Sequence, residues 1–521
     1  MKKRTNGFSA SSTSYYESAG QYNFSGQVGF TIKKTGILLS GARYYFDGWR
    51  NSDKPFTVER SRVADSMRYM DWKPKEQFMG TIVLSRNIKQ LQASFTSDYF
   101  FEEIMNRGFP RAPYQETAFD DYYKTKRFNN SFRLYGKAGK KHYVNLVSGL
   151  NNYTRIKNTY FKDLATLEQN LTENQGDQDT SRFNNITTRF SISSANDSSM
   201  LNYETGFDLG YETGTGLRIK NQKQSIGDYA VFASVEYRPS EKVVFKPALR
   251  VIYNTAYSAP LVPSFNIKYT VHGGHTLRAS YARGFRSPSL KELYFYFVDV
   301  NHNITGNQEL EAEHSHNFTL HYTFRHRRKK TEYAFELGGF YNHIENLITL
   351  SLGSGNSYSY FNLDLYKSTA VNTTISFNRK QFQASTGFSY IGQYNQLSET
   401  TATPVFVYSP ETKFNLQYRL VKARCTFSLF YKYTGILPLF ASDENGNVSQ
   451  MKTGAYSMAD FSVMKSFFGE FVKMTAGAKN LFNVTNVAGT TAGGTHAGGD
   501  LITPIGMGRI YFIKLDLNIT R

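Results

Sequence analysis

The sequence has almost no cysteine and no long hydrophobic run. Cys425 is the only cysteine among 521 residues, so an intramolecular disulfide is excluded. No stretch of about 18 apolar residues occurs in the chain, which excludes a transmembrane helix of ordinary length. No Pro-rich or Ser/Gly-rich linker divides the chain, and its composition does not shift along its length. We therefore expect one large folded unit.

Concentrated charge and catalytic motifs are also missing. The 61 Lys and Arg exceed the 42 Asp and Glu and give a net charge of +19, but they are scattered evenly. The one dense basic run, residues 325–330, separates two strand-like segments, and no nucleic-acid-binding motif accompanies it. HExxH, GxSxG and recognisable carboxylate pairs are absent from the sequence. We expect no enzyme activity, catalytic residue, bound metal or cofactor, and no nucleic-acid partner.

Aromatic residues and alternating polarity are abundant instead. The chain has 42 Phe and 38 Tyr, more than a disordered chain contains. Residues 242–254 place an apolar residue at nearly every odd position and polar residues at most even ones, and residues 316–326 and 511–519 show the same period of two. Such segments of about ten residues recur from end to end and are typical of β-strands with one apolar face.

The connections between these segments distinguish a membrane barrel from a soluble sandwich. Short connections alternate with long ones, as expected when short turns occupy one rim of a transmembrane barrel and long loops the other. The short ones lie at residues 238–241, 271–274, 325–330, 378–380, 421–423 and 467–470, and the long ones at 287–313, 343–359, 392–410, 435–454 and 481–508. The sequence therefore predicts an all-β fold: a transmembrane antiparallel β-barrel with long outer loops and short periplasmic turns.

The strand count suggests an incomplete barrel. We count about 21 strands, whereas bacterial single-chain barrels have an even number, so a barrel of about 22 strands with one missing is expected. Strand parity places the gap before residue 22. Residues 1–10 also lack the apolar stretch of a signal peptide. We expect residues 1–521 to be one barrel domain truncated at its amino end, without signal peptide or first strand.

Residues 281–318 resemble the late-barrel motifs of TonB-dependent outer-membrane receptors, which read close to GFRAPSLKELY and GNPDLKPE. The first motif is matched by Gly284, Phe285, Arg286 and Pro288, and the second by Gly306, Asn307, Leu310 and Glu313. Asn480, Leu481, Phe482 and Asn483 resemble the family's closing NLFN motif. Gln308 and Ala312 stand where the family has proline, and the chain ends on Arg521 and not on an aromatic residue. The resemblance is carried by the second half of the chain.

The resemblance implies a bacterial outer-membrane receptor for energised uptake of a scarce metal chelate: siderophore-iron, haem or cobalamin. Outer loops would capture the ligand, and outer-membrane lipid would surround a monomeric barrel. The TonB complex would act through a plug and TonB box that precede the barrel in the family and are absent from this sequence. A passive porin, a surface-binding barrel and a non-functional barrel fragment are the alternatives.

Several residues are candidate ligand contacts. In haem-binding members of the family a histidine lies between the two motifs, and His302 lies there in this chain. Imidazole and tyrosinate both ligate haem iron, so Tyr294, Tyr296 and His496, which lies in the last long loop, are further candidates. Arg286 either anchors a loop or contacts the ligand. Residues 172–179 carry three acidic residues without the spacing of an EF-hand, and we expect a solvated acidic loop there.

Overall fold

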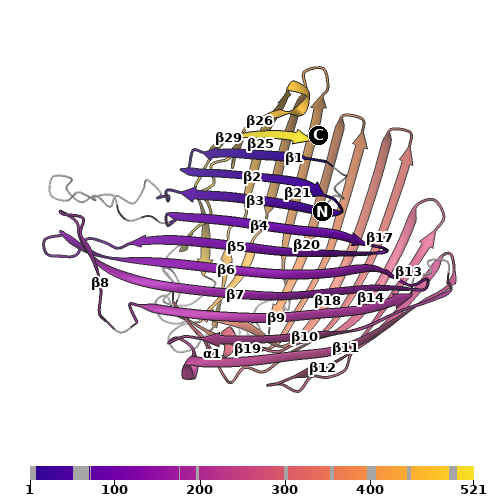
Figure 1. Ribbon diagram of the computed structural model, residues 1–521, viewed down its shortest axis with the longest axis horizontal. Helices are drawn as coiled ribbons and strands as arrows, with labels where there is room; N and C mark the ends of the chain where they lie inside the picture. The colour runs from indigo at the N-terminus through magenta and orange to yellow at the C-terminus, as the bar shows by residue number, and fades with distance from the viewer. Residues whose placement is uncertain are drawn as a thin grey trace.

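The computed structural model describes residues 7–50, 68, 70, 72–174, 176–194, 199–298, 303–352, 357–395, 406–442, 448–491 and 501–520. The chain forms a closed antiparallel barrel of 22 strands (Figure 1), which confirms the predicted fold class. No helix in the described part of the chain is long and apolar enough to cross a membrane.

Each barrel strand is hydrogen-bonded to a neighbour on either side. The first eleven are β1 (Ser9–Glu17), β2 (Gln21–Ile32), β3 (Thr35–Phe46), β4 (Lys75–Ile88), β5 (Leu91–Arg107), β6 (Thr117–Ala138), β7 (His142–Asp163), β9 (Asp179–Ser194), β10 (Leu201–Thr215), β11 (Lys223–Ser240) and β12 (Val243–Asn254). The other eleven are β13 (Val262–Val271), β14 (His275–Arg286), β17 (Glu313–Arg328), β18 (Thr331–Leu352), β19 (Ser357–Arg379), β20 (Phe382–Asn395), β21 (Val407–Leu420), β22 (Cys425–Thr434), β25 (Tyr456–Phe467), β26 (Val472–Lys479) and β29 (Ile510–Thr520).

The remaining elements belong to the long loops and to one short turn. They are β8 (Gln169–Leu171), η1 (Lys220–Gln222), α1 (Leu290–Tyr294), β15 (Tyr296–Val298), β16 (Asn303–Thr305), β23 (Leu437–Ser442), β24 (Val448–Thr453), η3 (Phe468–Glu470), β27 (Asn486–Thr491) and β28 (Leu501–Pro504). β23, β24, β27 and β28 form a separate small sheet that joins two long loops. The predicted parity of short turns and long loops is confirmed. We call the two edges of the barrel the short-turn rim and the long-loop rim.

Alternation along most strands separates an outward apolar face from a polar lumen. On β12 the outward residues Leu249 and Val251 are 44% and 45% exposed, although both are aliphatic. Exposed aliphatic side chains on every second position indicate contact with lipid acyl chains and not with water. Between them Arg250 faces the lumen and pairs with Asp208 of β10. At this position the wall is therefore apolar on its outer face, and on its inner face a cation pairs with a carboxylate of a nearby strand.

The prediction that the first strand is missing is wrong. Residues Ser9–Glu17 form β1, which pairs with β2 on one side and with β29 on the other. Figure 1 shows indigo β1 beside yellow β29. The outward positions of β1 are Ala10, Ser12, Ser14 and Tyr16, so the apolar alternation that revealed the other strands is nearly absent here. Its identity as a strand comes from its neighbours and not from its own pattern.

We expect proline in β1 to weaken barrel closure. Ser12 pairs with Gly26 of β2 and Leu517 of β29, and proline there removes a backbone donor from a ladder in lipid, at a cost of about 1 to 3 kcal/mol. The folded fraction of Ser12→Pro, measured by heat-modifiable electrophoretic mobility, should fall below that of the unaltered chain. Ser12→Val keeps the donor and adds an apolar outward side chain, so it should fold normally. Equal folding of the two variants would contradict this account of closure.

Candidate ligand-binding site at the long-loop rim

Arg286 ends β14 and joins the two sequence motifs. Its guanidinium donates to both carboxylate oxygens of Glu292 at 3.1 and 3.0 Å and to Glu313 Oε1 at 2.5 Å. Glu292 lies in α1 and Glu313 begins β17, so one cation bridges a loop helix to the next strand. The two glutamate side chains are only 15% and 14% exposed and depend on this partner. The contacts support the loop-anchoring role of Arg286, and direct ligand contact stays a prediction.

Local sequence explains why α1 forms where it does. Pro288, which is fully buried, follows the end of β14. Ser289 caps the helix: its hydroxyl accepts from the Glu292 amide, and the Glu292 carboxylate accepts from the Ser289 amide. A helix of five residues cannot persist on hydrogen bonds alone. It is held by Leu290 and Leu293, which are 0% and 2% exposed.

Each of these two leucines belongs to a small apolar core at the long-loop rim. Leu290 packs with Phe183, Ile219 and Phe295, and Leu293 with Leu310 and Ile348. A Cβ at Gly214 of β10 would lie 2.7 Å from Leu290 Cδ2. Glycine at this position therefore lets the helix approach the barrel wall.

The second motif folds back onto the helix. Asn307 donates its backbone amide to the Glu292 carbonyl at 2.8 Å and its side chain to the Tyr360 carbonyl of β19 at 3.0 Å. A Cβ on Gly306 would lie 2.9 Å from the Leu293 carbonyl carbon, which explains the glycine. The motif therefore fastens α1 to the wall formed by β19.

Leu310 completes this attachment. Its side chain is 3% exposed, and its carbonyl accepts a 2.9 Å hydrogen bond from the Tyr257 hydroxyl. Tyr257 lies in the loop after β12, where burial raises the pKa of its phenol and the neighbouring Tyr294 phenol raises it further. The hydroxyl therefore stays protonated and keeps donating at neutral and mildly alkaline pH.

The tyrosine and histidine candidates have different outcomes. Tyr294 is half-buried and packs against both apolar cores. Tyr296 is 41% exposed, and the Arg218 guanidinium lies 6.0 Å from its ring centroid. His302 and His496 lie outside the described residues. Haem ligation by any of these four residues therefore stays a prediction.

The NLFN motif organises the start of the last long loop. Asn480 has a φ of 50°, a left-handed conformation that asparagine tolerates. Its buried amide donates to the Val484 and Gly508 carbonyls at 2.8 and 3.0 Å and accepts from the Val484 amide at 3.0 Å. Asn483 accepts from the Arg509 amide at 2.8 Å. The motif therefore holds the ends of β26 and β29 together.

Two further residues of this motif have contacts. Leu481 donates its amide to the Ala459 carbonyl at 2.7 Å and accepts from the Arg509 guanidinium. Phe482 packs edge-on against Tyr431 with ring centroids 6.3 Å apart. The contacts of all four motif residues are structural.

Sequence reasoning missed a group of cations and aromatic rings in the lumen near the long-loop rim. The Arg155 guanidinium lies 5.1 Å from the Tyr123 ring centroid and 4.8 Å from that of Phe297. The Lys291 ammonium lies 5.0 Å from the Tyr153 ring and 4.8 Å from the Phe183 ring. We call these six residues the cation-aromatic patch. No local signal predicts it, because its members are far apart in the sequence and only barrel closure brings them together.

The register places the patch on the luminal side of the wall. Tyr153 of β7 lies opposite Phe183 of β9. Three residues away, Leu150 and Ile186 also lie opposite each other and are 43% and 52% exposed on the outward face. Odd positions of these two strands therefore face the lumen.

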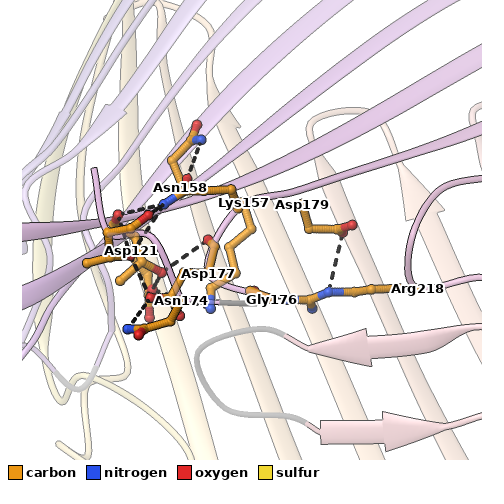
Figure 2. Close-up of polar contacts among 11 residues, drawn as sticks. Asp121, Lys157, Asn158, Asn174, Gly176, Asp177, Asp179 and Arg218 are labelled. Atoms are coloured by element: carbon orange, nitrogen blue, oxygen red, sulfur yellow. Dashed lines mark hydrogen bonds and ion pairs between the residues drawn. The ribbon is translucent and has the colours of Figure 1, made fainter. Parts of the chain in front are cut away.

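The acidic loop between β7 and β9 belongs to a polar cluster that also includes Asp121 of β6 and Arg218 of the loop after β10 (Figure 2). Asp177 accepts from the Thr172 hydroxyl at 2.5 Å and the Asn174 amide at 3.1 Å. Asp179 lies 3.4 Å from Arg218 Nε and is buried, so the expected solvated loop is wrong for this residue. Within the described residues no three His, Cys, Asp or Glu side chains are placed to hold a metal ion.

We expect Arg286→Ala to loosen the loop between β14 and β17. Two partly buried carboxylates would then face each other without a cation, at a cost of about 1 to 2 kcal/mol after allowing for the partial exposure of Arg286. Limited proteolysis of the folded barrel should cut residues 287–312 several times faster. Arg325→Ala removes an exposed ion pair with Glu336 and should leave the rate unchanged. Equal cleavage of both variants would refute the anchoring role.

A family model described as "TonB dependent receptor-like, beta-barrel" matches residues 5–481. No curated protein matches the chain. Among solved structures, the siderophore receptor PirA from Acinetobacter baumannii is 13% identical with a TM-score of 0.73 and is aligned over 99% of this chain and 81% of its own.

Other solved structures have the same fold. PirA from Pseudomonas aeruginosa is 15% identical with a TM-score of 0.69, covering 99% of this chain and 81% of its own. The FrpB iron transporter from Neisseria meningitidis (F3-3 variant) is 13% identical with a TM-score of 0.71, covering 99% and 82%. At these identities the structures establish the fold alone, whereas the family model covers most of the chain. The chain therefore belongs to the family of TonB-dependent receptor β-barrels.

Proposed function

We propose that this chain is the barrel of an outer-membrane receptor that imports a scarce metal chelate, with siderophore-iron as the first candidate. The long-loop rim captures the chelate, and uptake is energised by the TonB complex. The role is transport, and no covalent chemistry is involved. Family membership and the fold shared with siderophore receptors support this assignment.

The cation-aromatic patch is the observation that carries the ligand chemistry. Within the described residues neither Arg155 nor Lys291 has a carboxylate at ion-pair distance, although Lys291 lies close enough to Glu212 to interact with its charge. Both cations lie over aromatic rings near the long-loop rim. Cations beside rings attract anions, and the rings offer faces on which a planar group can stack.

An anionic chelate with aromatic groups fits this chemistry best. A ferric tris-catecholate carries net negative charge together with aromatic rings, so it would gain from both parts of the patch. Neutral hydroxamate chelates lack the charge and the rings. Haem and cobalamin remain alternative cargoes. His302 and His496, which could ligate haem iron, lie outside the described residues.

We expect ferric tris-catecholate to quench tryptophan fluorescence of the chain in detergent micelles. Both tryptophans, Trp49 and Trp72, pair through their backbones at the base of one long loop, so emission comes from the long-loop rim. Arg155→Gln and Lys291→Gln should each weaken binding about tenfold, because each removes one charge-assisted contact. Arg133→Gln is the matched control. Arg133 also lies over a ring, that of Tyr135, at 4.6 Å, but it is not part of the patch, so this variant should bind normally.

The competing cargoes give distinct results in the same titration. Stronger quenching by haem or cobalamin, unaffected by the two glutamine variants, would replace the catecholate assignment. Quenching by none of the three chelates, with neutral hydroxamate chelates also without effect, would contradict the receptor function itself.

A further inference from the structure

Four basic residues form a continuous row across the outward face of four adjacent strands. The register places Arg283 of β14 opposite His316 of β17, His316 opposite His343 of β18, and His343 opposite Lys367 of β19. Residues directly opposite in an antiparallel sheet project to the same side. Neighbouring strands are about 4.8 Å apart, so the row is about 14 Å long. We call these residues the basic row.

The basic row lies on the lipid side of the wall. One residue pair nearer the short-turn rim, Tyr281, Phe318 and Tyr341 form the adjacent row, and Phe318 is 48% exposed. The next row contains Leu320, which is 55% exposed. Aromatic residues followed by charge mark the level at which acyl chains give way to headgroups. The basic row therefore lies at headgroup height on the long-loop side.

An apolar groove of about 550 Å³ opens directly below the row. It is lined by small residues, Ala279 and Gly339, and by larger ones such as Phe265, Phe318 and Leu320. Ala279 and Gly339 both lie opposite Leu320 on either side. The groove spans the outward face of β13, β14, β17, β18 and β19, and its lining is mostly apolar, as an acyl chain requires.

The row and its neighbour His314 contain nitrogens that no hydrogen bond uses. Arg283 Nε is buried without a hydrogen-bond partner in the described residues, and so is Nδ1 of His314, which lies two residues from His316 on β17. His316 Nδ1 lies 2.9 Å from the Tyr281 hydroxyl, so when the tyrosine donates, His316 Nε2 carries the proton and can donate. The Lys367 ammonium lies 4.9 Å from the Tyr394 ring centroid.

One acidic side chain lies beside the row. Glu345 Oε1 is 3.4 Å from His343 Nε2, and Glu345 lies opposite His314. The negative charge therefore offsets the His343 part of the row. The Arg283–His316 end has no ion-paired carboxylate in the described structure, and an anion would be held there most strongly.

We propose that the basic row and the groove bind a phosphorylated glycolipid of the outer leaflet, of the lipid A type. A phosphate lies on Arg283 and His316, a second phosphate reaches toward Lys367, and acyl chains fill the groove. A disaccharide headgroup with a phosphate at each end matches a row of this length, whereas a glycerophospholipid presents a single phosphate. The inference rests on the outer-membrane placement in the proposed function, but it concerns the opposite face of the wall from the chelate site.

The test measures lipid binding to the purified full chain in detergent, by native mass spectrometry and by titration with fluorescent lipid A. Bisphosphorylated lipid A should bind at least about tenfold more tightly than its dephosphorylated form or phosphatidylethanolamine, because charge-assisted contacts to phosphate are lost in the comparison. Arg283→Ala combined with Lys367→Ala should remove that preference. Equal binding of the three lipids would overturn the proposal.

Two further variants separate the groove from the charges and from folding. Ala279→Leu fills the groove without altering charge and should weaken lipid A binding. Lys465→Ala is the matched control, because Lys465 also lies over an aromatic ring, that of Phe467, at 5.4 Å, but on β25 near the short-turn rim. It should bind lipid A normally. Heat-modifiable mobility confirms folding of each variant, and wild-type affinity in folded Ala279→Leu would overturn the role of the groove.

These measurements test the lipid site and the chelate site separately. Loss of lipid A preference with intact tris-catecholate quenching is expected for the row variants. Absent chelate binding together with the expected lipid pattern would refute the proposed cargo and leave the lipid site supported. Absent lipid preference with normal chelate binding would refute the lipid site alone.

Discussion

Closure of the backbone ladder is the constraint on which the rest of the molecule depends. A strand in lipid has no water to satisfy its amides and carbonyls, so every strand needs a partner on both sides. β1 meets this need for β2 and β29 although its outward face is nearly devoid of apolar side chains. Backbone pairing can thus hold a strand that side-chain hydrophobicity alone would not keep in a membrane.

Closure also determines where the functional groups meet. Arg155 and Lys291 are separated by more than a hundred residues in sequence, and they share a surface because the wall curves back on itself and α1 folds inward. The motifs that resemble the receptor family serve this arrangement. Arg286, Asn307 and Asn480 hold loops to strand ends, and the binding chemistry lies in residues around them that carry no motif.

The sequence predicts this architecture well because period-two alternation follows directly from lipid on one side and water on the other. It failed at β1, where serines replace apolar residues at Ser12 and Ser14, since the pattern contains no signal there. It identified Arg286 but not its two carboxylate partners, because both contacts depend on how the loop folds. The cation-aromatic patch could not be predicted from the sequence for a similar reason. Strand register determines which residues are cross-strand neighbours, and local sequence does not reveal the register.

The strands of the barrel differ widely in length. β6 and β7 have 22 residues each, and β18 and β19 have 22 and 23, whereas β12 and β13 have 12 and 10. A membrane needs only about ten residues of tilted strand, so the two long pairs extend well beyond the acyl layer, whereas β12 and β13 are about as long as the acyl layer requires. The extra residues of each pair stay hydrogen-bonded to each other along their whole length, so the wall continues as a paired sheet outside the lipid.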